Sequence, residues 1–256
     1  MVFIKSIVGD KMMYLLAEFQ KMKRNNTIFI VIVATFFINL MSVFQTNYDG
    51  TFSLREYADV LLWNHSCFLY PVMITLICGY LIDLEYKNNT LKNIYLAAIN
   101  SRTLICAKLF VGFCFLLIIA ILEFICSTIG VICCHIEVSG ESVGYFFVQQ
   151  IVFAFCSFIS VLPIIIFGAQ KENGYLFGSL VAAFLEICGI FLAPRGLCGY
   201  YAITAGLEIL NFNGGMVGGT LFSGNQGEVT LLITIGLSVL LLYILCPKNR
   251  DYMIEK

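Results

Sequence analysis

The chain has 256 residues, of which 60% are hydrophobic and only 12% are charged. A soluble domain has about 45–50% apolar and about 25% charged residues, so this chain carries more apolar surface than a water-exposed fold of its size can hide. The formal net charge of −1 provides no basic field to attract a nucleic acid. The composition therefore excludes a soluble enzyme and a nucleic-acid partner, and it predicts an integral membrane protein with several spans.

The N-terminal arm is predicted to form an amphipathic helix that lies in the membrane interface. Apolar side chains recur there at helical spacing, with charged side chains between them. An ordinary cytoplasmic tail is the alternative. The apolar positions are Val8, Met12, Leu15, Leu16 and Phe19.

Six apolar runs follow, each about long enough to cross a bilayer as a helix. Their periodicity is helical or continuous, so we expect an all-α membrane protein in which residues 1–256 form one transmembrane domain of six helices. The predicted spans cover residues 27–44, 66–82, 109–134, 145–169, 175–193 and 229–246.

The lysines and arginines predict the orientation of these spans. Of the 15, only Arg55 and Arg195 fall in the loops after the first, third and fifth spans. Because basic residues collect on the cytoplasmic side, both termini are expected in the cytoplasm of a multi-pass protein of the bacterial cytoplasmic membrane. The loops then assigned to the outside carry seven acidic residues: Asp49, Glu56, Asp59, Glu137, Glu141, Glu208 and Glu228.

The inner loop between the second and third spans predicts a short amphipathic helix. Asn89 or Thr90 is a suitable N-cap. The residues that follow place four apolar side chains on one face, which fits a groove on a partner protein or the lipid interface. These side chains are Leu91, Ile94, Tyr95 and Ala98.

This loop resembles the first cytoplasmic loop of ABC-2-type permeases. The shared features are an acidic residue at Glu85, an Asn-Thr step ending at Thr90, a Ser-Arg step ending at Arg102, and an Ala-Lys step ending at Lys108. Residues 18–24 are also similar to the Glu-x-x-Lys-x-Lys-Arg pattern of that family's N-terminal helix. The chain departs from the family pattern in lacking a proline before the Ser-Arg step. In length and general sequence character, the chain looks most like the lantibiotic-immunity subfamily of these permeases.

The resemblance implies that this loop is a coupling helix that docks on a separate ATPase subunit. No GxxxxGK motif ending in Ser or Thr occurs, so ATP and Mg are expected on that ATPase and no cofactor is expected on this chain. A second permease, identical or related, and a lantibiotic-like peptide substrate are implied as further partners. The residues assigned to docking are Glu85, Thr90, Leu91, Ile94, Tyr95 and Arg102.

Two acidic residues, Glu123 and Glu186, fall inside predicted spans, where a carboxylate costs about 2.5–3.5 kcal/mol on insertion scales. Each is either a substrate-facing or proton-linked group, or one half of a packed interhelical hydrogen bond. No catalytic residue and no metal site is predicted, and His65 is expected to be a solvated loop residue, as is His135. The partners expected for Glu123 are Gln149, Gln150, Ser157 or Ser160.

Residues 194–228 are glycine-rich yet still apolar, and they predict short helical pieces, one of them within 200–212, in a broken outer segment before the last span. Irregular backbone at membrane depth has to be covered by protein or face a wet cavity. The leading interpretation is the permease of a peptide exporter. The alternatives are an ABC-2 permease for another hydrophobic substrate, a membrane sensor or assembly protein, and a proton-coupled transporter using Glu123 and Glu186.

Overall fold

The computed structural model describes residues 26–48, 54–88, 101–133, 140–212 and 225–246. Within these ranges the chain is helical apart from short turns and contains no strand, so the expectation of an all-α fold is confirmed. The N-terminal arm and the predicted coupling helix, with Thr90, Leu91, Ile94 and Tyr95, lie outside the described residues.

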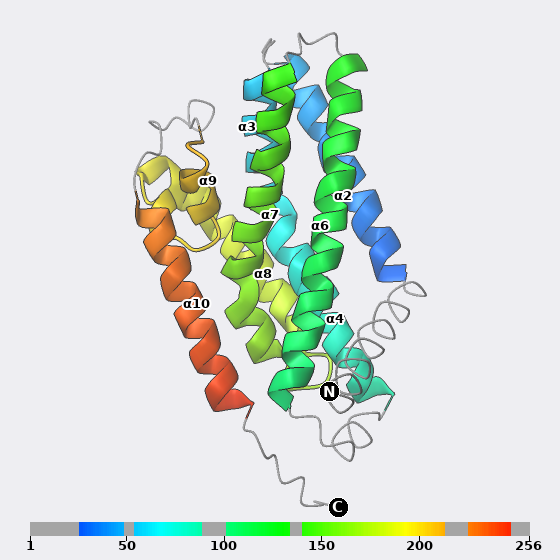
Figure 1. The fold of residues 1–256 in the computed structure, drawn as a ribbon, viewed down its shortest axis with the longest axis vertical. Coiled ribbons are helices and arrows are strands. Elements are labelled where there is room, and N and C mark those ends of the chain that lie inside the picture. Colours follow the sequence, from blue (N-terminus) through cyan, green and yellow to red (C-terminus); the bar gives the residue numbers. More distant parts are fainter. Residues whose placement is uncertain (1–25, 49–53, 89–100, 134–139, 213–224, 247–256) are drawn as a thin grey trace, which may run out of the picture.

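The described helices run along one another in a bundle (Figure 1). Two short 3-10 turns and a small helix separate the last long helix from the others. The elements are α2 (Asn26–Tyr48), α3 (Leu54–Phe68), α4 (Tyr70–Lys87), α6 (Ser101–Cys133), α7 (Gly140–Gly168), α8 (Gly174–Leu192), η1 (Ala193–Arg195), η2 (Cys198–Tyr200), α9 (Ala205–Ile209) and α10 (Gln226–Leu245).

Five of these helices are long and apolar enough to cross a membrane, and there are six spans if α3 and α4 are counted as one bent span. Large apolar side chains cover their outward faces, where a soluble protein would carry polar ones. Examples on four helices are Phe37, Ile125, Phe184 and Leu232. This surface is that of a multi-pass membrane protein.

The second predicted span differs most from the structure. The polar stretch at 45–65 was expected to be a loop, but α2 continues to Tyr48 and α3 begins at Leu54. The helix is broken at Leu69, and α3 and α4 meet at an angle of 50°. Hydropathy misses α3 because its polar residues, among them Asp59 and Asn64, are buried against neighbouring helices.

Helix α4 lies in the middle of the bundle and contacts α8, α7 and α6. Its close approach to α8 depends on Gly79, since a Cβ atom there would lie 2.6 Å from Cβ of Tyr175. Small residues allow such approaches between membrane helices. The sequence shows glycines in the spans, but only the packing shows which of them lies at a crossing.

Replacing Gly79 with alanine is expected to destabilise the protein by about 1–3 kcal/mol, because the added methyl group overpacks the α4–α8 contact. The matched control is Gly236→Ala in α10, where an added Cβ would meet no atom within 4 Å. Alanine is the better helix former, so the control variant is expected to be neutral or slightly stabilised. Thermal unfolding in detergent measures both, and equal stability of the two variants would contradict the packing role of Gly79.

The segment from η1 to α9 contains helical pieces, as predicted, although the helix expected within 200–212 is only Ala205–Ile209. Hydrogen bonds join this segment internally and to α10. The Thr204 hydroxyl donates to the carbonyl oxygen of Cys198 at 2.8 Å, and the Thr230 hydroxyl donates to that of Gly199 at 2.6 Å. We call residues 198–209 the η2–α9 segment, and the hydrogen bond from Thr230 attaches this segment to the start of α10.

Candidate functional site

The break between α3 and α4 creates a helix start inside the bundle. Leu69 has φ −137° and ψ −61°, which is not helical, and Pro71 is the second residue of α4. Proline suits the first turn of a helix because it has no N–H group to leave unpaired. The other N–H groups of that turn still need acceptors, and little water is available at this depth.

Glu186 of α8 supplies one of these acceptors. The backbone N–H of Val72 donates to Glu186 Oε1 at 3.2 Å. The Glu186 side chain is buried, and a carboxylate at a helix N-terminus is also favoured by the helix dipole. Glu186 of α8 therefore caps the start of α4, because it accepts a hydrogen bond from an N–H group that has no acceptor within the helix.

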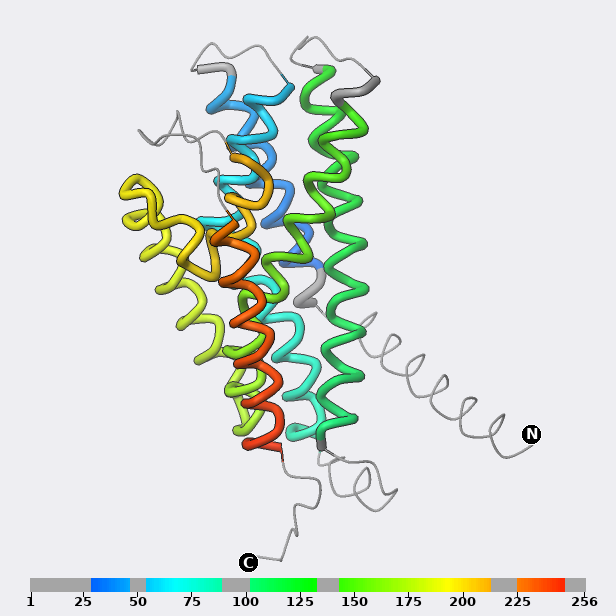
Figure 2. The backbone as a smooth tube through the Cα atoms, turned by 60° about the vertical axis from the view of Figure 1, so that its left-hand side comes forward, coloured from blue at the N-terminus to red at the C-terminus, as the bar shows by residue number. Residues whose placement is uncertain are grey.

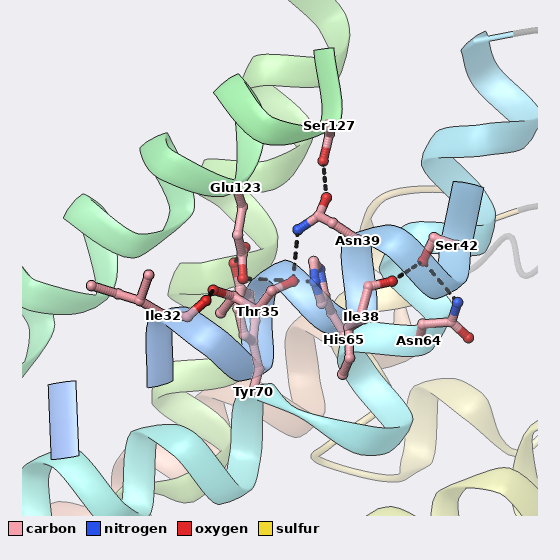
Figure 3. A network of polar contacts seen from close by, with 10 residues as sticks. All are labelled: Ile32, Thr35, Ile38, Asn39, Ser42, Asn64, His65, Tyr70, Glu123 and Ser127. Atoms are coloured by element: carbon pink, nitrogen blue, oxygen red, sulfur yellow. Dashed lines mark hydrogen bonds and ion pairs between the residues drawn. The ribbon is translucent and has the colours of Figure 1, made fainter. Parts of the chain in front are cut away.

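Glu123 of α6 contacts the same turn from another side. The Tyr70 hydroxyl donates a hydrogen bond to Glu123 Oε2. His65 Nε2 lies 3.6 Å from Glu123 Oε1, and both side chains are at most 1% exposed. The His65 ring stacks on Tyr70 with 5.0 Å between centroids, and Tyr70 stacks in turn on Phe153 of α7 at 5.5 Å. Figure 3 shows His65, Tyr70 and Glu123 directed toward one another.

The structure thus brings both predicted intramembrane acids to the first turn of α4. We call this cluster the elbow site: His65, Tyr70, Val72, Glu123 and Glu186. The sequence spacing conceals it because His65 and Tyr70 are five residues apart and would point in different directions on a straight helix. Only the break at Leu69 allows their rings to stack.

Two sequence-based expectations about these residues are wrong. His65 is fully buried rather than solvated, because α3 is packed within the bundle. The partners of Glu123 are Tyr70 and His65. The residues proposed instead have other surroundings. The Ser160 hydroxyl donates to the carbonyl oxygen of Ser157. The buried amide atoms Gln149 Oε1, Gln150 Oε1 and Gln150 Nε2 have no hydrogen-bond partner among the residues that the structure describes.

A band of polar contacts extends from the elbow site across α2. The Ser127 hydroxyl of α6 donates to Asn39 Oδ1, and Asn39 Nδ2 donates to the carbonyl oxygen of Thr35 at 3.0 Å. Asn64 of α3 donates to the Ser42 hydroxyl at 2.9 Å. These contacts, drawn in Figure 3, connect α2, α3 and α6 without using a basic side chain.

A second polar cluster lies at the lower end of the bundle in Figure 1, which we call the base: the ends of α4, α7 and α10 and the starts of α6 and α8. Lys108 of α6 is buried there. Its ammonium group donates to Glu85 Oε1 at 2.9 Å and to the carbonyl oxygen of Leu81 at 2.7 Å. The helix that contains the third predicted span therefore begins at Ser101, eight residues before 109, since Lys108 is paired inside the helix bundle and does not interrupt the helix.

Other contacts at the base join α4 to the turn between α7 and α8. Asp83 accepts a hydrogen bond from the backbone N–H of Asn173 at 2.6 Å and pairs with Lys87 at 3.0 Å. The Tyr86 hydroxyl donates to the carbonyl oxygen of Ala169 at 3.0 Å. The last turn of α4, which leads into the predicted coupling helix, is thus fixed to α6 and to the turn between α7 and α8.

Arg102 lies in the first turn of α6, directly after the predicted coupling helix. Its Nε atom donates to the carbonyl oxygen of Cys246 at 2.6 Å and its Nη2 atom to that of Tyr243 at 2.9 Å. The guanidinium carbon also lies 4.0 Å from the centre of the Tyr243 ring. Of the six residues assigned to docking, the structure describes Glu85 and Arg102, and it places both in contacts between helices.

Comparison with known proteins agrees with this architecture. A family model described as ABC-2 family transporter protein matches residues 14–189, which is more than half of the chain and includes the elbow site and the inner loop. No curated protein and no solved structure matches the chain. The chain therefore belongs to the ABC-2 transporter family, as the membrane-spanning permease subunit of an ABC transporter that works with an ABC ATPase.

Proposed function

We propose that this permease exports a lantibiotic-like, amphipathic cationic peptide, taking it from the outer leaflet to protect the cell that carries it. The chain acts as one transmembrane domain beside a second permease, identical or related. ATP and Mg are bound by the ATPase. The observation that carries the proposal is the match to the ABC-2 family over residues 14–189. The size and overall character of the chain, which look most like the lantibiotic-immunity subfamily, are the reason for proposing a peptide substrate.

The proposed orientation places the base of the bundle in the cytoplasm. Lys87, Arg102, Lys108 and Lys171 lie at this end of the described helices, and Arg55 lies at the start of α3 near the opposite end. This asymmetry supports cytoplasmic termini through the positive-inside rule. In this proposed orientation the inner loop between α4 and α6 faces the cytoplasm, where an ATPase can reach it.

The charge of the proposed outer surface gives weaker support than the sequence count suggests. Asp59 and Glu208 are buried, whereas Glu56 and Glu228 are exposed. The exposed carboxylates still favour a cationic peptide through an attraction that salt weakens. The region around η2 supports the proposal further, because Leu197 and Tyr200 are 40% and 63% exposed there and η2 itself packs on α10.

For docking, we propose that Leu91, Ile94 and Tyr95 insert into a groove of the ATPase and that Thr90 caps their helix. Glu85 contributes by holding α4 against Lys108 rather than by touching the partner, since it is 1% exposed. Ile94→Asp is expected to leave the permease inserted in the membrane and to abolish co-purification of the ATPase. The control Asn93→Asp adds the same charge on the opposite helix face and is expected to retain the ATPase. Full ATPase recovery with Ile94→Asp would overturn the docking assignment.

Peptide retention tests the substrate proposal. Sensitive cells that express this chain with its ATPase and any second permease are expected to survive higher doses of a cationic lantibiotic. They are also expected to retain less of it on their membranes, and only when the ATPase is active. Equal retention with active and hydrolysis-deficient ATPase would refute peptide extraction, and protection against an uncharged hydrophobic compound alone would favour an ABC-2 permease for another substrate.

A further inference from the structure

Helix α10 is the least enclosed of the candidate spans. Only 17% of its most apolar stretch is buried, against 50% for α7. It packs mainly on α7 and on the η2–α9 segment, and side chains such as Leu232, Val239 and Tyr243 point away from the protein. Helix α10 is therefore held mainly by one long helix, α7, and by contacts at its two ends.

At the base, Arg102 joins α10 to the start of α6. Its guanidinium donates to two carbonyl oxygens at the end of α10, where carbonyl groups have no partner within the helix. A cation at a helix C-terminus is also favoured by the helix dipole, and the planar guanidinium stacks on Tyr243. In Figures 1 and 2, α6 and α10 come close at the base and diverge toward the other end of the bundle.

At its other end, α10 is joined to the η2–α9 segment. The Thr230 hydroxyl donates to the carbonyl oxygen of Gly199. Gly227 lies so close to the segment that a Cβ atom there would be 2.6 Å from the carbonyl oxygen of Ala205. Helix α10 is thus attached to Arg102 at one end and to the η2–α9 segment at the other.

We propose that Arg102 is a positioning residue of the transport cycle, which transmits movement of the start of α6 to α10 and from there to the η2–α9 segment. The proposal rests on the docking of the preceding loop on the ATPase. Arginine suits this role because it makes two hydrogen bonds in a fixed geometry and a ring contact at once, whereas lysine offers a single ammonium group. Arg102 then acts through α10 and not through contact with the transported molecule.

The test measures nucleotide-driven displacement in the assembled permease–ATPase complex. The native cysteines are replaced, and spin labels are placed at exposed positions. The pair Thr103–Glu172 reports on the start of α6, and the pair Leu240–Glu172 reports on α10, each against the turn between α7 and α8. Both distances are expected to shift between the nucleotide-free complex and the complex trapped with ATP, Mg and vanadate.

In Arg102→Ala we expect the shift at α6 to persist and the shift at α10 to be lost. Arg102→Lys and Tyr243→Leu are expected to retain part of the α10 shift, because each preserves some of the contacts. Lys171→Ala, which removes another exposed charge at the base, is expected to behave like the parent protein. The two partial variants keep the test informative if Arg102→Ala fails to assemble.

The outcomes separate this inference from the docking proposal. An unchanged α10 shift in Arg102→Ala and Arg102→Lys, with the ATPase bound, would overturn the role of Arg102 and leave docking intact. Failure of the parent permease to retain an ATPase would instead overturn the docking proposal. Loss of the α6 and α10 shifts together in every Arg102 variant that still binds the ATPase would also contradict the inference, since Arg102 would then act on α6 itself.

Discussion

Replacing Lys108 with methionine is expected to destabilise the protein by about 3–5 kcal/mol, the usual cost of removing one partner from a buried ion pair. Methionine keeps the length of the side chain but leaves the Glu85 carboxylate, 1% exposed, without the ammonium group 2.9 Å away. The carbonyl oxygen of Leu81 loses its Lys108 donor as well. Unfolding in detergent, followed by heat or by denaturant, measures the loss.

Two comparisons make this prediction specific to the buried pair. Lys87→Met removes the partner of Asp83 in the same region, but Lys87 is 38% exposed, so the expected loss is below about 1 kcal/mol. The double variant Glu85→Leu with Lys108→Met removes both charges and is expected to recover most of the lost stability. Equal losses in Lys87→Met and Lys108→Met would contradict the assignment of Lys108 as the structural link between α4 and α6.

Glu123→Ala is expected to have the second-largest effect. It leaves the Tyr70 hydroxyl buried without its carboxylate acceptor, which costs about 1–3 kcal/mol, and it removes the carboxylate that packs 3.6 Å from the His65 ring. Tyr70→Phe is expected to cost less, because the ring keeps its stacking on His65 and Phe153. The double variant measures the coupling between Glu123 and Tyr70, which should be clearly non-zero for residues in contact.

Glu123→Gln distinguishes the two roles that the sequence leaves open for this acid. Glutamine retains an oxygen that accepts from the Tyr70 hydroxyl but removes the group that gains and loses a proton. A hydrogen-bonding role predicts near-normal stability and near-normal ATP-dependent transport. Near-normal stability with lost transport would instead show a proton-linked role, and a matched Glu186→Gln variant would show whether the cap on Val72 has the same property.

Several parts of the fold follow from the sequence because the bilayer imposes a simple length and polarity requirement. The last two long helices were expected at 175–193 and 229–246, and they occupy Gly174–Leu192 and Gln226–Leu245. Each is a continuous apolar run between polar residues, and each remains largely exposed on its outer face. Local composition determines where such helices begin and end, so little tertiary information is needed to find them.

The elbow site does not follow from the sequence in this way. Helix α3 has mixed polarity, and burial of Asp59, Asn64 and His65 becomes acceptable only when neighbouring helices surround them. The convergence of Glu123 and Glu186 on one turn depends on the break at Leu69 and on the packing of α6 and α8 around α4. Neither spacing nor hydropathy encodes the contact between residues so far apart in the chain.

The sequence by itself determined that this is an all-α membrane protein of the ABC-2 type, because apolar run length and the motif around the inner loop are local properties. Only the tertiary structure decided what the charged residues do. Lys108 and Arg102 are basic residues that a sequence count assigns to a loop, yet Lys108 pairs with Glu85 inside the bundle and Arg102 binds the end of α10. The physical reason is that a charge at the membrane boundary is stabilised by whichever oxygen atoms the fold brings to it, and those atoms come from helices distant in sequence.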